Sequence, residues 1–212
     1  MIHSTAHEQE PSARSPEIGT SRVEAFSDSV MAVIITIMAF ELRPPHGADL
    51  DAVRDQLPGV LAYVLSFTFV GIYWNNHHHL LRAADRISGA AMWANLFLLF
   101  WLSLIPVLTE WVRDEYLHPL PAASYGAVAL AAGLAYTILV RTLVQANGPE
   151  SRLATAIGSD VKGRLSLVLY AAAIGLAFVS PWISYGLYVA VALTWFVPDR
   201  RLTRRQGGQT RV

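Results

Sequence analysis

The sequence of 212 residues contains no cysteine. This absence excludes disulfide bonds, zinc sites built from thiolates and a cysteine nucleophile. Charge is also scarce: 15% of the residues are charged and 53% are hydrophobic, whereas a typical soluble domain has about 25% charged residues. The formal net charge is zero, which argues against a nucleic acid as partner. The composition is therefore typical of a protein embedded in lipid.

A signal peptide is missing as well, because residues 1–20 have no apolar stretch and contain Glu8, Glu10, Pro11 and Pro16. We expect residues 1–20 to form a disordered cytosolic leader. The segment "RRLTRRQGGQT" near the other end is polar and rich in arginine. Residues 199–212 are expected to form a basic cytosolic tail that contacts anionic membrane lipids.

Long apolar stretches fill the chain between these ends. About 20 residues of helix cross the hydrocarbon layer, and this length is reached by Arg22–Leu42, Leu57–His79, Ile87–Glu110 and Leu120–Val144. A charge-free run from Leu165 to Pro198 is too long for one span and contains the turn residues Ser180, Pro181 and Gly186. We divide it into two helices of about 17 residues. The predicted fold is all-α, a polytopic membrane protein with six transmembrane helices in residues 21–198.

The positions of basic residues predict the topology. With six spans and a cytosolic amino terminus, 13 of the 16 lysines and arginines fall in cytosolic segments, and only Arg43, Arg54 and Arg113 lie outside. Cytosolic loops favour lysine and arginine. Both termini are therefore expected in the cytosol of a multi-pass protein of the cell (inner) membrane. The acidic outer segments fit either ordinary solvated loops or a vestibule that concentrates cations.

The first predicted helix has a stripe of apolar residues and one isolated charge. Successive residues of a helix are rotated by about 100°, so Val33, Ile37 and Phe40 share a stripe with Thr36 at its edge. Asp28 lies about 140° away from Val33 by the same geometry. A charged side chain in lipid costs roughly 2.5–3.5 kcal/mol on insertion scales. Asp28 is therefore expected to face other protein.

The end of the second predicted helix, "GIYWNNHHHLL", offers partners for this carboxylate. Trp74, His77 and His78 lie on one helical face at i, i+3 and i+4, and their ring N–H groups could donate hydrogen bonds to Asp28. Three interpretations of the histidines stay open: an interfacial polar cap, a packing network with Asp28 and Arg22, and a metal site. Consecutive histidines splay around a helix, and the i, i+4 histidine pair that zinc favours is missing. No metal or other cofactor is predicted.

The motif Arg22-x-x-x-Phe26-Ser27-Asp28 at the start of the first helix resembles the signature of the transmembrane protein 175 family of potassium channels. The following "AVIITIMAFEL", the Trp74-x-x-His77 pair and the apolar third helix fit the same family. The resemblance covers Arg22 to Trp111 closely, and the remaining helices only in number and hydropathy. Some positions differ from the common pattern, including Ser29, Met31, Val33 and Phe40.

The resemblance implies a homotetramer in which four copies of the first helix line a pore for K⁺ ions, surrounded by membrane lipids. Carried over position by position, the pore constriction falls on Val33, Ile37 and Phe40, with Thr36 as a polar layer. The buried polar network that holds the pore helices falls on Arg22, Phe26, Ser27, Asp28, Trp74, His77 and His78.

Three classes of function are weighed on these residues. The first is a potassium-selective, leak-type channel, which needs no cofactor and is not an enzyme. The second is a proton-coupled secondary transporter that uses Asp28 and the second-helix histidines as a relay, although such carriers usually show paired repeats with helices broken at the midplane. The third is a membrane enzyme, but no known nucleophile or metal motif accompanies Asp28 and the histidines.

Overall fold

The computed structural model describes residues 19–157 and 160–196. In these ranges the chain forms α-helices and no β-strand. The helices are α1 (Thr20–Phe40), α2 (Leu50–Ala83), α3 (Gly89–Ser103), α4 (Ile105–Asp114), α5 (Pro119–Asn147), α6 (Arg152–Ile157), α7 (Val161–Leu176) and α8 (Pro181–Phe196). Residues 1–18 of the predicted leader and the whole predicted tail, residues 199–212, lie outside the described residues.

Four segments of the described chain are long and apolar enough to cross a membrane. They are α1, α2, the combined segment Gly89–Asp114 and α5. The helices α7 and α8 are shorter, with 16 residues each. Helix α7 begins at Val161, four residues before the charge-free run, and α8 begins at Pro181 within it. The predicted division of that run into two short helices is confirmed.

Two of the differences from the sequence-based expectation have a clear local cause. The second helix begins at Leu50 rather than Leu57, because the Asp49 carboxylate caps it by accepting a hydrogen bond of 2.9 Å from the backbone N–H of Ala52. The third predicted span is interrupted at Leu104, between α3 and α4. Pro106 explains the interruption, since proline has no N–H and its ring clashes with the carbonyl of residue i−4. The short helix α6 lies between the fourth and fifth predicted spans, where no helix was predicted.

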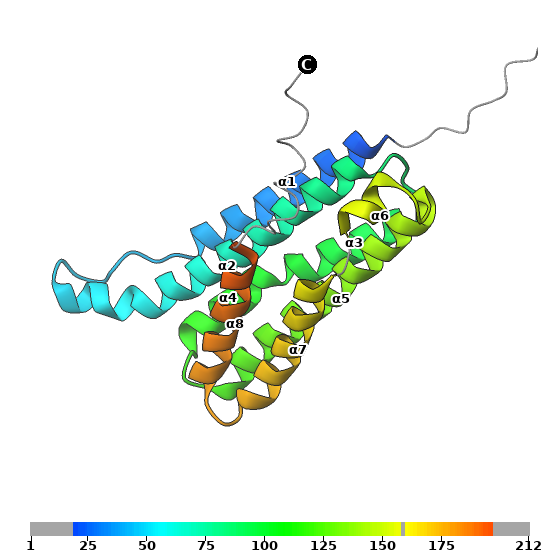
Figure 1. Ribbon diagram of the computed structural model, residues 1–212. Coiled ribbons are helices and arrows are strands. Elements are labelled where there is room, and N and C mark those ends of the chain that lie inside the picture. Colours follow the sequence, from blue (N-terminus) through cyan, green and yellow to red (C-terminus); the bar gives the residue numbers. More distant parts are fainter. Residues whose placement is uncertain (1–18, 158–159, 197–212) are drawn as a thin grey trace, which may run out of the picture.

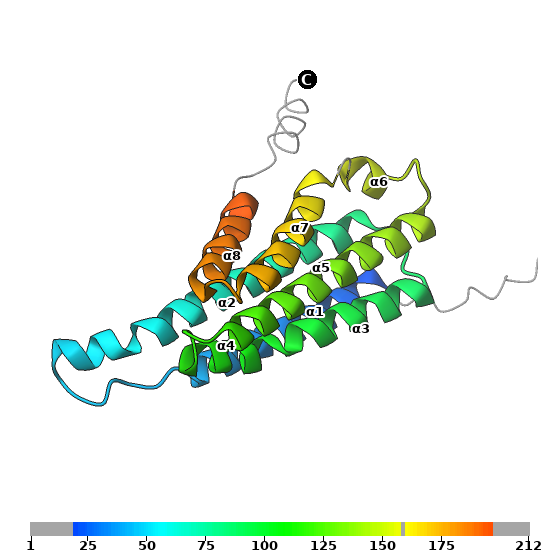
Figure 2. The same cartoon turned by 90° about the horizontal axis from the view of Figure 1, so that it is seen from below.

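The long helices lie side by side, and α7 and α8 pack against them as an antiparallel pair (Figures 1 and 2). Helix α1 contacts α2, α3 and α4, whereas α5 contacts α3, α7 and α8. The packing surface of α5 is formed by small residues, including the fully buried Ala122, Ala129, Ala132 and Ala135. Small side chains allow helix backbones to approach closely, which is the usual way that helices pack in lipid.

The two ends of the bundle carry opposite charge. One end contains the connections 41–49, 115–118 and 177–180, and we call it the acidic end (Figure 1). Its acidic residues are Glu41, Asp49, Asp51, Asp55, Glu110, Asp114 and Glu115, against the three arginines Arg43, Arg54 and Arg113. The opposite end, called the basic end, contains the start of α1 and the connections 84–88 and 148–151. Its basic residues are Arg22, Arg82, Arg86, Arg141, Arg152, Lys162 and Arg164, against the five acidic residues Glu24, Asp28, Asp85, Glu150 and Asp160.

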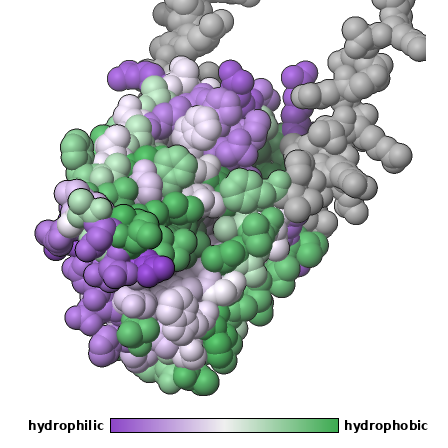
Figure 3. All heavy atoms as spheres, turned by 90° about the vertical axis from the view of Figure 1, so that its left-hand side faces the viewer, coloured by the Kyte–Doolittle hydropathy of each residue, from purple (hydrophilic) through white to green (hydrophobic). Residues whose placement is uncertain are grey.

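Large apolar side chains cover the outside of the bundle. Figure 3, which views the molecule from the side on which α2 protrudes, shows hydrophobic residues over much of the surface between hydrophilic groups. Leu61, Trp93, Phe100, Val168 and Phe178 are among the exposed ones. A soluble monomer rarely exposes apolar surface on this scale, so this surface is suited to lipid and to other protein subunits.

Candidate functional site

Helix α1 presents one face to the bundle and another to the outside. Its buried residues are Val23, Ser27, Met31, Ile34 and Met38. On the opposite side Phe26, Val33, Ile37 and Phe40 are 52%, 53%, 43% and 88% exposed. We call Val33, Thr36, Ile37 and Phe40 the α1 stripe.

The polar member of the stripe is already engaged with its own helix. Thr36 is exposed, and its hydroxyl donates a hydrogen bond of 2.9 Å to the carbonyl of Val33. The oxygen of that hydroxyl keeps lone pairs for a further partner. The four side chains of the stripe therefore lie together on a surface that no described part of this chain covers.

A directed chain of hydrogen bonds joins α1, α2 and α3 beneath this surface. His77 Nε2 lies 2.7 Å from Asn95 Oδ1 and must donate, because an amide oxygen only accepts. Asn95 Nδ2 donates to Ser27 Oγ at 2.9 Å, and Ser27 donates to the carbonyl of Val23 at 2.8 Å. The side chains of Ser27, His77 and Asn95 are buried. The structure thus connects the predicted residues Ser27 and His77 through Asn95.

A second group of side chains joins α1 and α2 at His78. Its Nδ1 atom lies 2.7 Å from Glu24 Oε1, with 27% and 19% of the two side chains exposed. Trp74 stacks on the imidazole at a centroid distance of 5.9 Å. The structure therefore brings the predicted residues Trp74 and His78 together, and it adds Glu24 as their partner on α1.

Three of the predicted network residues take a different position. Asp28 Oδ1 is buried but has no hydrogen-bond partner among the described residues. The expected bonds from the Trp74 or histidine rings to this oxygen are not formed. Arg22 and Phe26 are exposed, and with Asn95 they line a hollow on the surface. Within the described chain the Arg22 side chain makes no hydrogen bond or ion pair.

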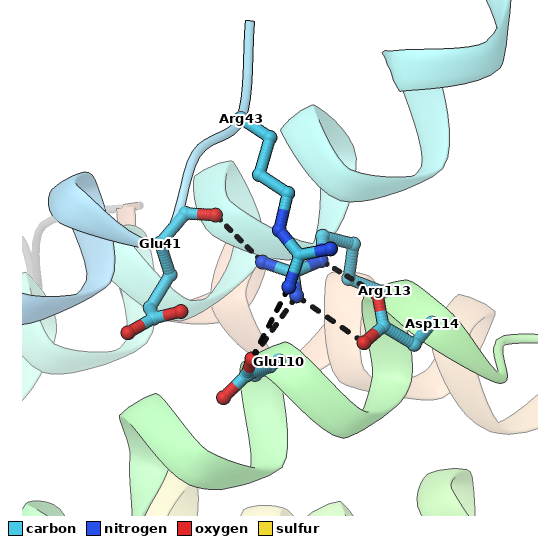
Figure 4. Close-up of polar contacts among 5 residues, drawn as sticks. All are labelled: Glu41, Arg43, Glu110, Arg113 and Asp114. Atoms are coloured by element: carbon cyan, nitrogen blue, oxygen red, sulfur yellow. Dashed lines mark hydrogen bonds and ion pairs between the residues drawn. The ribbon is translucent and has the colours of Figure 1, made fainter.

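At the acidic end an arginine holds the last turn of α1. Arg113 of α4 donates through Nη1 to the carbonyl of Glu41 at 2.6 Å, through Nε to Asp114 at 2.8 Å and through Nη2 to Glu110 at 3.2 Å (Figure 4). Arg43 approaches Glu110 at 3.8 Å and is mostly exposed. Only 10% of the Arg113 side chain is exposed.

A third polar cluster lies in the interior between α2, α4 and α5. Thr109 Oγ1 is 2.7 Å from Ser66 Oγ, which is 3.1 Å from the Tyr125 hydroxyl. Thr109 also lies 3.8 Å from the sulfur of Met38 on α1. All four side chains are buried. Contacts with the buried face of α1 are therefore polar at the basic end, in the interior and at the acidic end.

Sequence reasoning missed Asn95, Glu24, Thr109 and Arg113. A signal existed for Asn95, since it is the one amide in the apolar sequence "AAMWANLFLLFWL", and polar residues in such runs usually pair with other helices. Glu24 also carried a signal, because it precedes Asp28 by one helical turn. Thr109 and Arg113 looked like ordinary residues at a helix end, and only the tertiary structure reveals their partners.

The sequence has clear relatives. Residues 22–106 match the family described as endosomal/lysosomal potassium channel TMEM175. A potassium channel of Chryseobacterium sp. (strain P1-3) is 45% identical over 183 residues, which cover 86% of this chain and 95% of that protein. A potassium channel of Streptomyces collinus is 31% identical over 185 residues, which cover 82% of this chain and 90% of that protein.

A solved structure is similar along almost the same length. It is the crystal structure of a lysosomal potassium-selective channel TMEM175 homolog from Chamaesiphon minutus, with a TM-score of 0.73 and 25% identity over 83% of this chain and 95% of that one. The similarity thus extends well beyond the segment Arg22–Trp111 that carries the sequence motifs. With its long apolar helices and these relatives, the chain is an all-α multi-pass membrane protein and not an enzyme. It belongs to the TMEM175 family of ion channels.

Proposed function

We propose that this chain is one subunit of a potassium channel whose pore is lined by the α1 stripe. The observation that carries the proposal is the exposure of Val33, Thr36, Ile37 and Phe40 on a helix whose other face is fixed inside the bundle. Relatives over most of the chain are named potassium channels. An apolar stripe facing a central axis would give a narrow pore with apolar walls.

A single copy of α1 cannot enclose a pore, so several subunits must surround an axis. We infer a homotetramer with four copies of α1 at its centre. The polar contacts of α1 support this arrangement. Asn95 fixes the helix at the basic end through Ser27, and Arg113 fixes it at the acidic end through the Glu41 carbonyl. A helix held at both ends keeps its stripe in a defined orientation.

Conduction through such a pore depends on its width. An apolar ring offers a dehydrated ion no ligand, and it passes ions only when it is wide enough to stay wet. Discrimination for K⁺ over Na⁺ follows from the lower cost of dehydrating the larger ion, and the hydroxyl of Thr36 supplies a polar layer. The rings of Val33, Ile37 and Phe40 serve as the constriction and as the gate.

The proposed topology has six transmembrane helices, with α7 and α8 as the last two, in residues 21–198. Among the described residues seven basic side chains lie at the basic end and three at the acidic end. The positive-inside rule then places the basic end in the cytosol, together with both termini. We place the protein in the cell (inner) membrane, with residues 1–20 as a cytosolic leader and residues 199–212 as a tail near anionic lipids.

Ion flux in liposomes tests the function. The purified protein is reconstituted in vesicles with a K⁺ gradient, and its mass is measured in detergent. A channel gives uncoupled flux that does not saturate, from a species with the mass of four chains. Flux that requires a pH gradient would instead favour a proton-coupled transporter that uses Glu24, Asp28 and His78, and absence of flux from an intact tetramer would contradict the channel.

A further inference from the structure

Two carboxylates and one imidazole converge between α1 and α2 at the basic end. Glu24 and Asp28 are one turn apart and project from the same side of α1, and His78 reaches them from α2. One potential ligand atom of each residue lies within 4.8 Å of those of the other two. We call these three residues the acid–histidine cluster, and each is partly buried.

The cluster holds more negative charge than the surrounding protein balances. His78 is engaged with only one of the two carboxylates, since its Nδ1 atom lies 2.7 Å from Glu24 Oε1. Asp28 Oδ1 is shielded from solvent and lacks any hydrogen-bond partner among the described residues. Arg22, the nearest basic residue along α1, is exposed and makes no ion pair with the described part of the chain. A carboxylate oxygen that is shielded from solvent and unpaired is unfavourable, so this arrangement calls for a further cation.

A neighbouring buried histidine repeats the pattern. His77 is fully buried, and its Nε2 atom donates to Asn95. Its Nδ1 atom is shielded from solvent and has no partner in the described chain. A solvent-shielded polar atom without a partner is therefore present on both α1 and α2 in this part of the bundle.

We propose that the acid–histidine cluster binds a divalent transition-metal cation, with Zn²⁺ as its simplest representative. One imidazole nitrogen and two carboxylate oxygens are ligands that zinc accepts, with a water molecule in the fourth position. Magnesium and calcium prefer six or more oxygen ligands, which this site does not offer. A divalent cation carries two positive charges and therefore neutralises both carboxylates.

The required movements are small. Bond lengths of about 2.0–2.1 Å to zinc place its ligand atoms roughly 3.4 Å apart. Side-chain rotation of Glu24 and Asp28 can bring the atoms from their present separation to that distance. Trp74 stacks on His78 and holds the ring in place. The bound ion would tie the first turns of α1 to α2, close to the bonds that join Ser27, Asn95 and His77.

Binding does not depend on the proposed channel function, so it is measured without ion flux. The tag-free protein is purified in detergent, treated with a chelator and titrated with Zn²⁺ in a calorimeter. We expect one Zn²⁺ per chain and a higher temperature of unfolding in its presence. The variants E24Q and D28N keep the side-chain shape, H78Q replaces the imidazole with an uncharged amide, and each should weaken the affinity at least tenfold. The control H79Q removes the exposed neighbouring histidine and should leave the affinity unchanged.

X-ray absorption at the zinc edge then identifies the ligands in the unmodified protein, even if a variant does not fold. One imidazole with oxygen ligands supports the proposal. A shell with two or more imidazoles, an equal loss of affinity in H79Q and H78Q, or unchanged affinity in the E24Q/D28N/H78Q triple variant would each overturn it. So would equally tight binding of Mg²⁺ at the same stoichiometry.

Discussion

Arg113 on α4 donates a hydrogen bond of 2.6 Å to the backbone carbonyl of Glu41, the residue that follows the last turn of α1. The carbonyls at a helix end have no partner in their own helix, and here a guanidinium supplies one. The same side chain contacts Glu110 and Asp114, so a single residue orients the end of α1 relative to α4.

We expect R113M to lower the free energy of unfolding by about 1–3 kcal/mol, since it leaves the Glu41 carbonyl and two carboxylates without their donor. Thermal unfolding in detergent measures the change. The control R54M removes an exposed ion pair, in which Arg54 and Asp51 are 71% and 81% exposed, and should change stability by much less. Equal effects of R113M and R54M would show that the contact with Glu41 contributes little.

Gly59 on α2 leaves the space that the Arg113 side chain fills. A Cβ atom at Gly59 would lie 2.8 Å from Cγ and 3.0 Å from Cδ of Arg113. We expect G59A to destabilise the protein by about 1–3 kcal/mol through overpacking. G71A on the same helix meets no atom within 4 Å and should stabilise it by up to about 1 kcal/mol. A G59A variant as stable as G71A would contradict this prediction.

The hydrogen-bond chain through Asn95 predicts a specific defect. N95L keeps the side-chain size but leaves the buried His77 N–H without its acceptor, at about 1–3 kcal/mol. The Ser27 oxygen loses its donor, while its hydroxyl still donates to the Val23 carbonyl. We expect a lower unfolding temperature and a shift toward smaller species in size-exclusion chromatography. N75L changes an exposed asparagine on α2 and should preserve both properties. If N95L retains the stability and the elution profile of the unmodified protein, the chain through Asn95 is dispensable.

The α1 stripe predicts a change in conduction. We expect I37N to raise the leak and to lower discrimination between K⁺ and Na⁺ in liposomes, because a polar ring stays wet at a smaller radius. The assembly should remain intact, because Ile37 is exposed on the subunit. I34N is the matched control: Ile34 is 3% exposed, so a polar group there should disturb folding instead. Unchanged flux and selectivity in a folded I37N assembly would remove Ile37 from the ion path.

The topology is tested with reporters fused after Val212. A reporter that matures only in the cytosol should be active, because six spans return the chain to the side on which it began. A silent cytosolic reporter together with an active periplasmic one at the same position would mean an odd number of spans.

Length and hydropathy were sufficient to predict where most helices lie, since a membrane span needs a long apolar stretch whatever its neighbours. The break before Pro181 was predictable for a similar reason, because turn residues act locally. The cap at Asp49 and the interruption before Pro106 also depend on single residues nearby. An average hydropathy over a long segment does not register such single residues, so neither feature was predicted.

The polar contacts were only partly predictable. Helical geometry separated Asp28 from the α1 stripe, and the family motif selected Ser27 and His77. Neither could show that Asn95 joins those two, because the partner lies on a third helix and its position depends on how three helices pack. Glu24 and Arg113 show the same limit, since a charged residue near a helix end looks solvated until the tertiary structure provides a partner.

The short pair α7 and α8 has a consequence for the surrounding membrane. In the proposed topology α7 and α8 cross the membrane, and their 16 described residues each are about 24 Å long, whereas the hydrocarbon layer is about 30 Å thick. Lipid tails next to this pair would have to compress, while those beside α2 and α5 would not. Such a mismatch costs a fraction of a kcal/mol per ångström. A change in bilayer thickness should therefore affect each subunit mainly at α7 and α8. Thin membranes should favour the packing of these two helices against α5.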